Sequence, residues 1–256
     1  MLECRNLSFS YGEKPVLQNI SLAFEDGRVS CLIGPNGSGK STLLSLLSGL
    51  RKPDAGQVLL DKKPVCEYGR KERARRISYV QQSAPTDFDF TVADVVMMGR
   101  YPYLPPLGGI GTRDKECADK AMEKMGLLAL AARPATALSG GEWQRVMIAR
   151  AICQDTKTIL LDEPVASLDL SYQLETLKYV RELAGEGRCV VVVLHALALA
   201  LHYSDELFLI KDGALFAAGA PEKVLSAPNI MTVYGAKAGV ERLEDGRLEF
   251  VPRYDG

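Results

Sequence analysis

The sequence predicts an α/β fold, in which a mixed sheet with flanking helices follows an N-terminal antiparallel β subdomain and carries an inserted α-helical subdomain. Three patterns lead to this prediction. Between residues 2 and 33, apolar and polar residues alternate as they do in half-buried antiparallel strands. Short apolar runs then recur between helical segments, as in a sheet covered by helices. From Thr91 to about Gln154 the pattern is helical instead.

Composition limits the class of protein. With 256 residues, 47% of them hydrophobic, the chain can bury a full core, so we expect one large domain or one domain with an insertion. The net charge of −1 argues against a general nucleic-acid binder, which is expected to be basic. The first residues do not resemble a signal peptide. The longest apolar run, Cys189 to Leu201, is too short to span a membrane, so we expect a soluble protein.

The cysteines indicate reduced thiols. No two of the six form a C-x-x-C pair, and several lie in apolar runs, so we interpret them as core residues of a cytoplasmic protein. They are Cys4, Cys31, Cys66, Cys117, Cys153 and Cys189.

The first of the N-terminal strands ends at Tyr11-Gly12. An exposed aromatic ring at this place can stack on a flat ligand such as a nucleotide base. The alternative interpretation is a surface tyrosine at a turn.

A glycine-rich segment joins the apolar run 29–33 to a helical pattern over 41–48, which Gly49 can end. It fits G-x-x-x-x-G-K-[ST], the phosphate-binding P-loop, in the strand–loop–helix context that this motif needs. Its backbone N–H groups and the helix N-terminus attract phosphate, while Lys40 reaches the β- and γ-phosphates and the Ser41 hydroxyl holds Mg²⁺. The sequence therefore predicts a P-loop NTPase core. The segment is Gly34, Pro35, Asn36, Gly37, Ser38, Gly39, Lys40 and Ser41.

A further strand at 57–60, a polar helix and a strand at 77–80 come next, and the last of these runs into Gln81-Gln82. The stretch 70–76 is locally basic. It can indicate RNA binding, but a solvated helix face fits better with a net charge near zero.

Within the helical block, Thr91 is an N-cap residue, and a second helix over 113–125 ends at Gly126. A Pro/Gly-rich loop over 100–112 lies between them. The next helix begins at Ser139, and Ser139-x-x-Glu142 is a capping box. Gly140 and Gly141 also remove side chains from this helix N-terminus, whose N–H groups can then face an anion.

The apolar strand 158–162 ends in two carboxylates, Asp162 and Glu163, which suit Mg²⁺ binding and water activation in a chain with a P-loop. The run 189–194, another buried strand, leads to His195. His202 follows on a helix, and the spacing of the two histidines argues against a metal site of their own. The tail alternates around Asp245-Gly246, a strong hairpin signal.

Taken together, the P-loop, Leu138–Glu142 and Leu160–Glu163 resemble the ATP-binding subunit of an ABC transporter over about residues 2–235. The resemblance implies two bound ligands, ATP and Mg²⁺. It makes Tyr11 the base-stacking residue, Glu163 the general base, His195 the γ-phosphate sensor, Gln82 the glutamine of the lid loop and Asp162 a Mg²⁺ ligand through water. Lys40 and Gln82 join the catalytic set, and Ser41, Gln82 and Asp162 form the metal set. The nucleotide contacts are Tyr11, the P-loop residues through Ser41, Thr42, and Ser139, Gly140, Gly141 and Glu142.

The segments 97–102 and 133–136 resemble importer ATPases for iron-siderophore, haem or cobalamin complexes. Ala196 departs from the aspartate that commonly follows the histidine, and Trp143 occupies a variable position. The expected domains are an ATPase domain over 1–235, with the helical subdomain at about 91–154, and a C-terminal β-hairpin extension over 236–256.

The resemblance also implies partners. Two copies form a homodimer around two MgATP, with Ser167-Leu168-Asp169 crossing between subunits, at the cytoplasmic face of a membrane. Two permease subunits and, indirectly, a substrate-binding protein complete the importer, without nucleic acid. The alternative is a soluble ABC-type ATPase acting on DNA or the ribosome. We further expect Tyr101 and Tyr103 to dock a helix of the membrane subunit, or instead to fold down over their own subdomain.

Overall fold

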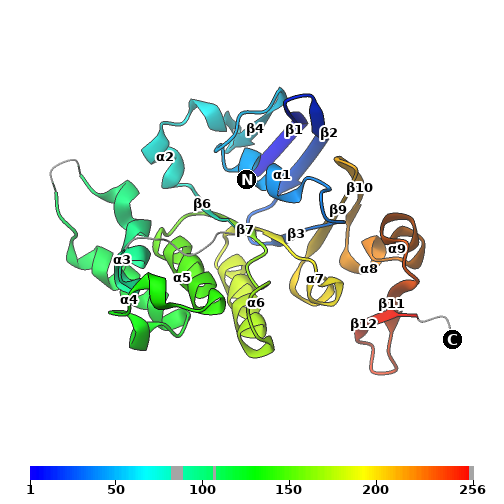
Figure 1. Ribbon diagram of the computed structural model, residues 1–256. Coiled ribbons are helices and arrows are strands. Elements are labelled where there is room, and N and C mark those ends of the chain that lie inside the picture. Colours follow the sequence, from blue (N-terminus) through cyan, green and yellow to red (C-terminus); the bar gives the residue numbers. More distant parts are fainter. Residues whose placement is uncertain (82–88, 106–107, 254–256) are drawn as a thin grey trace. The chain divides into compact units, whose positions relative to one another are not determined.

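The computed structural model describes residues 1–81, 89–105 and 108–253. The chain divides into two compact units. The first comprises Met1–Glu67 together with Val180–Gly256, and the second comprises Tyr68–Tyr179. Figure 1 shows the elements of both units.

The first unit begins with an antiparallel sheet in the order β2-β1-β4-β5. Its core face carries apolar side chains from alternate positions of β1, among them Leu2, Leu7 and Phe9. The alternation shifts by one at Arg5-Asn6, where the pairing with both neighbouring strands has a bulge. The predicted N-terminal β subdomain is therefore present. The strands are β1 (Leu2–Tyr11), β2 (Lys14–Phe24), β4 (Ala55–Leu60) and β5 (Lys63–Pro64).

The same unit contains four strands of a mixed sheet, in the order β10-β9-β3-β8. β3 pairs in parallel with both β8 and β9, and β10 pairs antiparallel with β9. Every residue of β3 and β8 is buried, which explains why these strands are apolar except for Ser30. The predicted strand at 29–33 is confirmed, and the one predicted at 189–194 is present but ends one residue earlier. The four are β3 (Val29–Ile33), β8 (Cys189–Val193), β9 (Glu206–Lys211) and β10 (Ala214–Gly219).

Helices follow these strands, and the chain closes with a hairpin. β11 pairs antiparallel with β12 around the predicted Asp245-Gly246 turn, where Gly246 has φ 83. β11 packs against α9, and β12 packs against α7. The helices are α1 (Lys40–Leu47), the one-turn η1 (Val65–Glu67), α7 (Leu197–Tyr203), α8 (Pro221–Val224) and α9 (Ala227–Tyr234), and the strands are β11 (Ala238–Arg242) and β12 (Leu248–Pro252).

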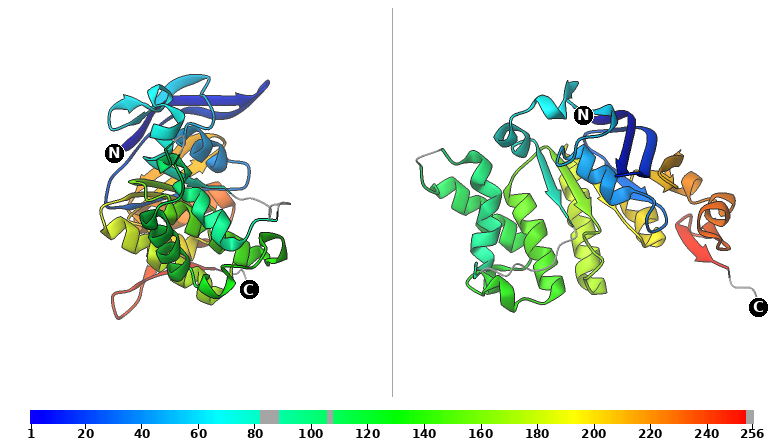
Figure 2. Two further views of the ribbon diagram at one scale, coloured as in Figure 1. Left: turned by 90° about the vertical axis from the view of Figure 1, so that its left-hand side faces the viewer. Right: turned by 45° about the horizontal axis from the view of Figure 1, so that its top comes forward.

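In the second unit, β6 (Ile77–Val80) and β7 (Thr158–Asp162) pair in parallel. Helices α3, α4 and α5 pack on one another, as both views of Figure 2 show. The Thr91 cap is confirmed, because its hydroxyl accepts from the Asp94 N–H. The helices are α2 (Arg70–Ala74), α3 (Val92–Met97), η2 (Met98–Tyr103), α4 (Thr112–Lys124), η3 (Leu128–Leu130), η4 (Ala135–Ala137), α5 (Gly140–Cys153) and α6 (Leu170–Gly185), whose last turns belong to the first unit.

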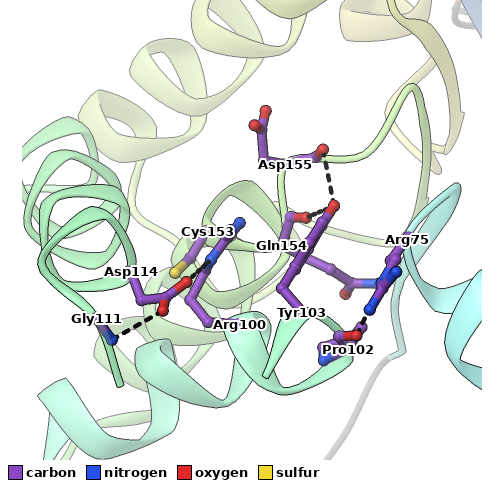
Figure 3. Close-up of polar contacts among 9 residues, drawn as sticks. All are labelled: Arg75, Arg100, Pro102, Tyr103, Gly111, Asp114, Cys153, Gln154 and Asp155. Atoms are coloured by element: carbon purple, nitrogen blue, oxygen red, sulfur yellow. Dashed lines mark hydrogen bonds and ion pairs between the residues drawn. The ribbon is translucent and has the colours of Figure 1, made fainter. Parts of the chain in front are cut away.

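The predicted loop over 100–112 starts instead with η2, and Tyr103 does not project into solvent. Its hydroxyl donates to the Gln154 carbonyl at 2.9 Å, and the Arg100 guanidinium lies 4.0 Å from its ring centre. Figure 3 shows how these residues lie. For Tyr103 these contacts bear out the second predicted alternative, folding down on its own unit. Tyr101 is 53% exposed, and its docking to a partner stays a prediction.

The Arg100 side chain holds this packing together. It is only 4% exposed and pairs with Asp114 at 2.9 Å while it donates to the Cys153 carbonyl at 2.9 Å. Arg75 donates to the Pro102 carbonyl at 2.8 Å. We call this set of contacts around η2 the Arg100 cluster (Figure 3).

The cysteine prediction holds for four of the six thiols. All six are free, but Cys66 is exposed and Cys117 is partly exposed, since neither lies in a strand or on the core face of a helix. Among the described residues, no helix combines the length and the apolar character needed to cross a membrane.

Candidate functional site

The P-loop lies in the first unit, between β3 and α1, and its glycines are required by geometry. Gly34, Gly37 and Gly39 all have positive φ, at 148, 78 and 99. A Cβ on Gly34 would lie 2.1 Å from the Ile210 carbonyl oxygen, and one on Gly39 would lie 2.6 Å from the Leu17 side chain. Sterically, only glycine fits at Gly34 and Gly39, and at Gly37 the positive φ favours glycine although a Cβ would meet nothing.

Lys40 is folded into the loop that precedes it. The residue is 5% exposed, and its ammonium donates to the carbonyls of Gly34 and Pro35, both at 2.8 Å. The N-cap of α1 is Gly39, which supplies no side-chain hydrogen bond to the first turn. The N-terminal N–H groups of α1 and the Lys40 charge thus lie at one end of one helix, an arrangement that suits an anion such as phosphate. Ser41 is exposed next to them, and Thr42 is partly exposed.

His195 lies at the same edge of the mixed sheet as the P-loop. Leu32 pairs with Val193 in the parallel ladder, and the Leu194 N–H donates to the Leu32 carbonyl at 3.3 Å. The exposed His195 therefore follows β8 at the strand end next to the one that leads into the P-loop. Tyr11 lies at the end of β1 and is 46% exposed.

The two acidic residues lie in the second unit, at the carboxyl end of β7. Asp162 is 3% exposed, and the Tyr79 hydroxyl lies 3.4 Å from its Oδ2 as a donor. Val80 pairs with Leu161, so β6 ends beside Asp162. Gln82, which follows β6 in sequence, lies outside the described residues.

Glu163 has a left-handed backbone, with φ 50. Sequence reasoning did not predict this conformation, which is uncommon for a residue that is not glycine and concentrates at functional sites. The nearest signal is Pro164, because the residue before a proline is disfavoured in the right-handed helical region.

The N-terminus of α5 carries the predicted capping box. The Ser139 N–H donates to Glu142 Oε2 at 2.8 Å, and the Glu142 N–H donates to Ser139 Oγ at 3.2 Å. The hydrogen bond from the Ser139 backbone lowers the pKa of the Glu142 carboxyl, and the positive charge of Arg133 lowers it by a smaller amount. Glu142 is thus held by its own helix, and the exposed Gly140 presents bare backbone.

Gly141 lies against the segment that follows β7. A Cβ there would be 3.0 Å from the Ser167 carbonyl oxygen, a contact that sequence spacing cannot reveal. Within the second unit, then, the α5 N-terminus and residues 167–168 are packed together.

The predicted residues thus fall into two groups. Tyr11, the P-loop and His195 belong to the first unit, where the last two share a sheet edge, while Asp162, Glu163 and the 139–142 segment belong to the second. The first group can bind a phosphorylated ligand, and the second supplies a buried carboxylate, a strained glutamate and an uncovered helix N-terminus.

Comparison of this chain with known proteins identifies its family. Residues 17–166 match the family model described as ABC transporter. The chain is 42% identical over 93% of its length to the cobalamin import ATP-binding protein BtuD of Halobacterium salinarum, and it spans 60% of that protein's length. It is 40% identical over 92% of its length to the ferric enterobactin transport ATP-binding protein FepC of Escherichia coli K12, of which it spans 88%.

Solved structures with a similar fold belong to the same family. A putative metal-chelate type ABC transporter in an inward-facing conformation superposes with a TM-score of 0.84 at 29% identity, covering 99% of this chain and 97% of the other. The dimeric post-hydrolysis structure of the ATP-binding cassette MJ0796 with ADP and Pi superposes with a TM-score of 0.78 at 27% identity, covering 86% and 99%. The fold is therefore that of the P-loop NTPase core predicted above, and this chain belongs to the ABC transporter family, among its ATP-binding proteins.

Proposed function

We propose that this chain is the ATP-hydrolysing subunit of an ABC importer that takes up a metal chelate of the iron-siderophore, haem or cobalamin type. The observation that supports the ATPase part is the P-loop, in which buried Lys40 and the uncapped N-terminus of α1 lie at the same end of one helix. The cargo class is supported by the names of the relatives, which import cobalamin and ferric enterobactin.

Each site residue then has a role. Lys40 and the P-loop N–H groups hold the β- and γ-phosphates, and the exposed Tyr11 ring stacks on the base. Glu163 takes the proton of the attacking water, His195 senses the γ-phosphate, and Gln82 is the glutamine of the lid loop. Ser139, Gly140 and Gly141 offer the N–H groups of α5 to a phosphate of the partner copy.

The residues also fit Mg²⁺, which prefers oxygen ligands and keeps several of its waters. The exposed Ser41 hydroxyl and the buried Asp162 carboxylate are oxygen donors of this kind. Gln82, the third residue of the predicted metal set, lies outside the described residues. When bound, Mg²⁺ would neutralise charge on the phosphates, and the chain's part would be to supply oxygens from these residues.

The proposed assembly is a homodimer with two permease subunits, reached indirectly by a substrate-binding protein, at the cytoplasmic face of the membrane. The dimeric form of the MJ0796 cassette supports the pairing of two copies. A soluble ABC-type ATPase acting on DNA or the ribosome is the second candidate, but the net charge of −1 disfavours a nucleic-acid partner. We further infer that 91–154 acts as a helical subdomain inserted in the ATPase domain 1–235, followed by the extension 236–256.

Two measurements test the proposal. Purification of the tagged chain from solubilised membranes should bring down a hydrophobic, multi-spanning partner, and recovery only with ribosomes or DNA would favour the second candidate. Purified chain should release phosphate from MgATP, and Lys40→Ala should weaken ATP binding, since it removes the charge that meets the phosphates. Equal ATP affinity of the variant and the wild type would contradict the P-loop assignment.

A further inference from the structure

Arg51 lies on the ring of Tyr11. Its guanidinium carbon is 4.9 Å from the ring centre, and both residues are exposed. Phe9 meets the same tyrosine edge to face, with ring centres 5.0 Å apart and planes at 89°. Among the described residues, the Arg51 guanidinium contacts the Tyr11 ring and has no carboxylate or carbonyl partner.

The fold fixes the backbone of Arg51 at this place. Gly49 has φ 72 at the end of α1, and the N–H groups of Leu50 and Arg51 both donate to the Ser45 carbonyl, at 3.1 and 3.2 Å. On the other side, the Ser10 N–H donates to Asp54 Oδ2 at 2.7 Å, which ties the same loop to β1. The backbone is therefore anchored to both elements, and the long side chain is exposed.

One helix connects the two ends of the candidate nucleotide site. α1 starts at Lys40, and Arg51 follows its C-terminal turn. Its eight residues give a length of about 12 Å. A nucleoside triphosphate has its charge at one end and its flat base at the other. The helix start suits the charge, and the Tyr11–Arg51 pair suits the base.

A guanidinium is planar and stacks on aromatic faces. A base that slides between the Tyr11 ring and Arg51 would exchange one cation–π contact for two stacking contacts. The exposed Arg51 side chain can swing outward by the thickness of a ring to admit it. Purines offer more stacking area than pyrimidines, so such a pair discriminates between these two classes.

We propose that Arg51 is the second wall of the base site, and that the Tyr11–Arg51 pair gives the chain its preference for purine over pyrimidine nucleotides. This inference rests on the proposed ATP-binding function. The inference adds Arg51 to the proposed function as a residue that determines nucleotide specificity.

The test compares Arg51→Ala with Lys52→Ala, which removes the same charge from the next exposed residue. MgATP, MgCTP and inorganic tripolyphosphate are titrated calorimetrically against each variant. We expect Arg51→Ala to weaken MgATP binding by about 3- to 10-fold, to weaken MgCTP binding less, and to leave tripolyphosphate binding unchanged. Lys52→Ala should match the wild type with all three. In a Tyr11→Ala background the effect of Arg51→Ala should disappear.

These titrations test the role of Arg51 separately from the proposed ATP-binding function. If the wild type binds all three ligands and Arg51→Ala binds MgATP as well as or better than it does, the base-site role of Arg51 is rejected and the proposed function stands. An equal loss for tripolyphosphate would reduce Arg51 to a general charge effect and also reject the role. A wild type that binds none of them would overturn the proposed function and this inference together.

Discussion

Glu163 follows the last residue of β7 and has a left-handed backbone. Replacing it by glutamine keeps the shape of the side chain and removes only its basicity. We expect Glu163→Gln to bind ATP like the wild type and to lose about 10²- to 10⁴-fold in hydrolysis, the usual contribution of a positioned general base. Nucleotide titration measures the ATP binding of the variant, and phosphate release from the same preparation measures its hydrolysis.

Lys40→Ala is the matched control for that experiment, because it should lower affinity before chemistry begins. A Glu163→Gln variant with wild-type turnover would remove Glu163 from the catalytic set. The variant should also accumulate an ATP-bound dimer on size-exclusion chromatography, since the γ-phosphate stays in place.

Two glycines of the P-loop allow a test of its geometry. Gly37 has φ 78 with open space where a Cβ would lie, whereas Gly34 has φ 148 and a Cβ there would strike the Ile210 carbonyl. Gly37→Ala should cost about 1–2 kcal/mol of unfolding free energy from backbone strain alone. Gly34→Ala adds overpacking and should cost about 3–5 kcal/mol. Urea denaturation of both variants measures the difference, and equal costs would mean that the loop relaxes around the methyl group.

At the scale of elements, the Arg100 cluster fixes η2 to the end of α5. The hydrogen bond from Arg100, with a further one from the Gly111 N–H, lowers the pKa of the Asp114 carboxyl. A depressed folded-state pKa means that the stabilisation is present above the unfolded pKa and is lost as pH falls through the folded value. Asp114→Asn should therefore destabilise the chain by about 2 kcal/mol near neutral pH, less than a fully buried pair would.

The pH dependence of that variant provides its own control. The stability gap between wild type and Asp114→Asn should shrink as the solution is acidified below 3.8, the ordinary pKa of an aspartate carboxyl. Thermal melts across this range measure it. A gap that stays constant with pH would show that the lost contribution is packing rather than charge.

The elements themselves could be predicted from the sequence because their signals are local. The apolar run of β8, the Thr91 cap and the Ser139–Glu142 capping box each depend on neighbouring residues. Tyr103 could not be predicted, since its partner Gln154 is 51 residues away and an aromatic in a Pro/Gly-rich stretch looks exposed. The same holds for Gly141 and Ser167, whose contact depends on tertiary packing.

At the scale of the whole molecule, the proposed dimer predicts complementation. Ser139→Arg spoils the α5 N-terminus, and Lys40→Ala spoils the P-loop. A mixed dimer of the two variants contains one site damaged twice and one with both parts intact. Mixing should therefore restore part of the hydrolysis that neither variant has alone.

Phosphate release from the mixture, with heterodimers verified by differently tagged copies, measures this recovery. Ser139→Ala serves as a folding control, because loss of the N-cap alone costs only about 1 kcal/mol. Heterodimers that form without any recovery would mean that the sites are not shared, or that both must work together.

A Cβ on Gly141 would lie 3.0 Å from the Ser167 carbonyl oxygen, so one of the two segments would have to shift slightly to admit a methyl group. We expect the start of α5 and residues 167–168, which lie in this close contact, to move together in the proposed dimer. In the proposed dimer each copy extends both segments toward its partner, so a displacement at one nucleotide reaches the surroundings of the other. The two nucleotide sites of the dimer would then be coupled, and each cycle would hydrolyse two ATP molecules rather than one.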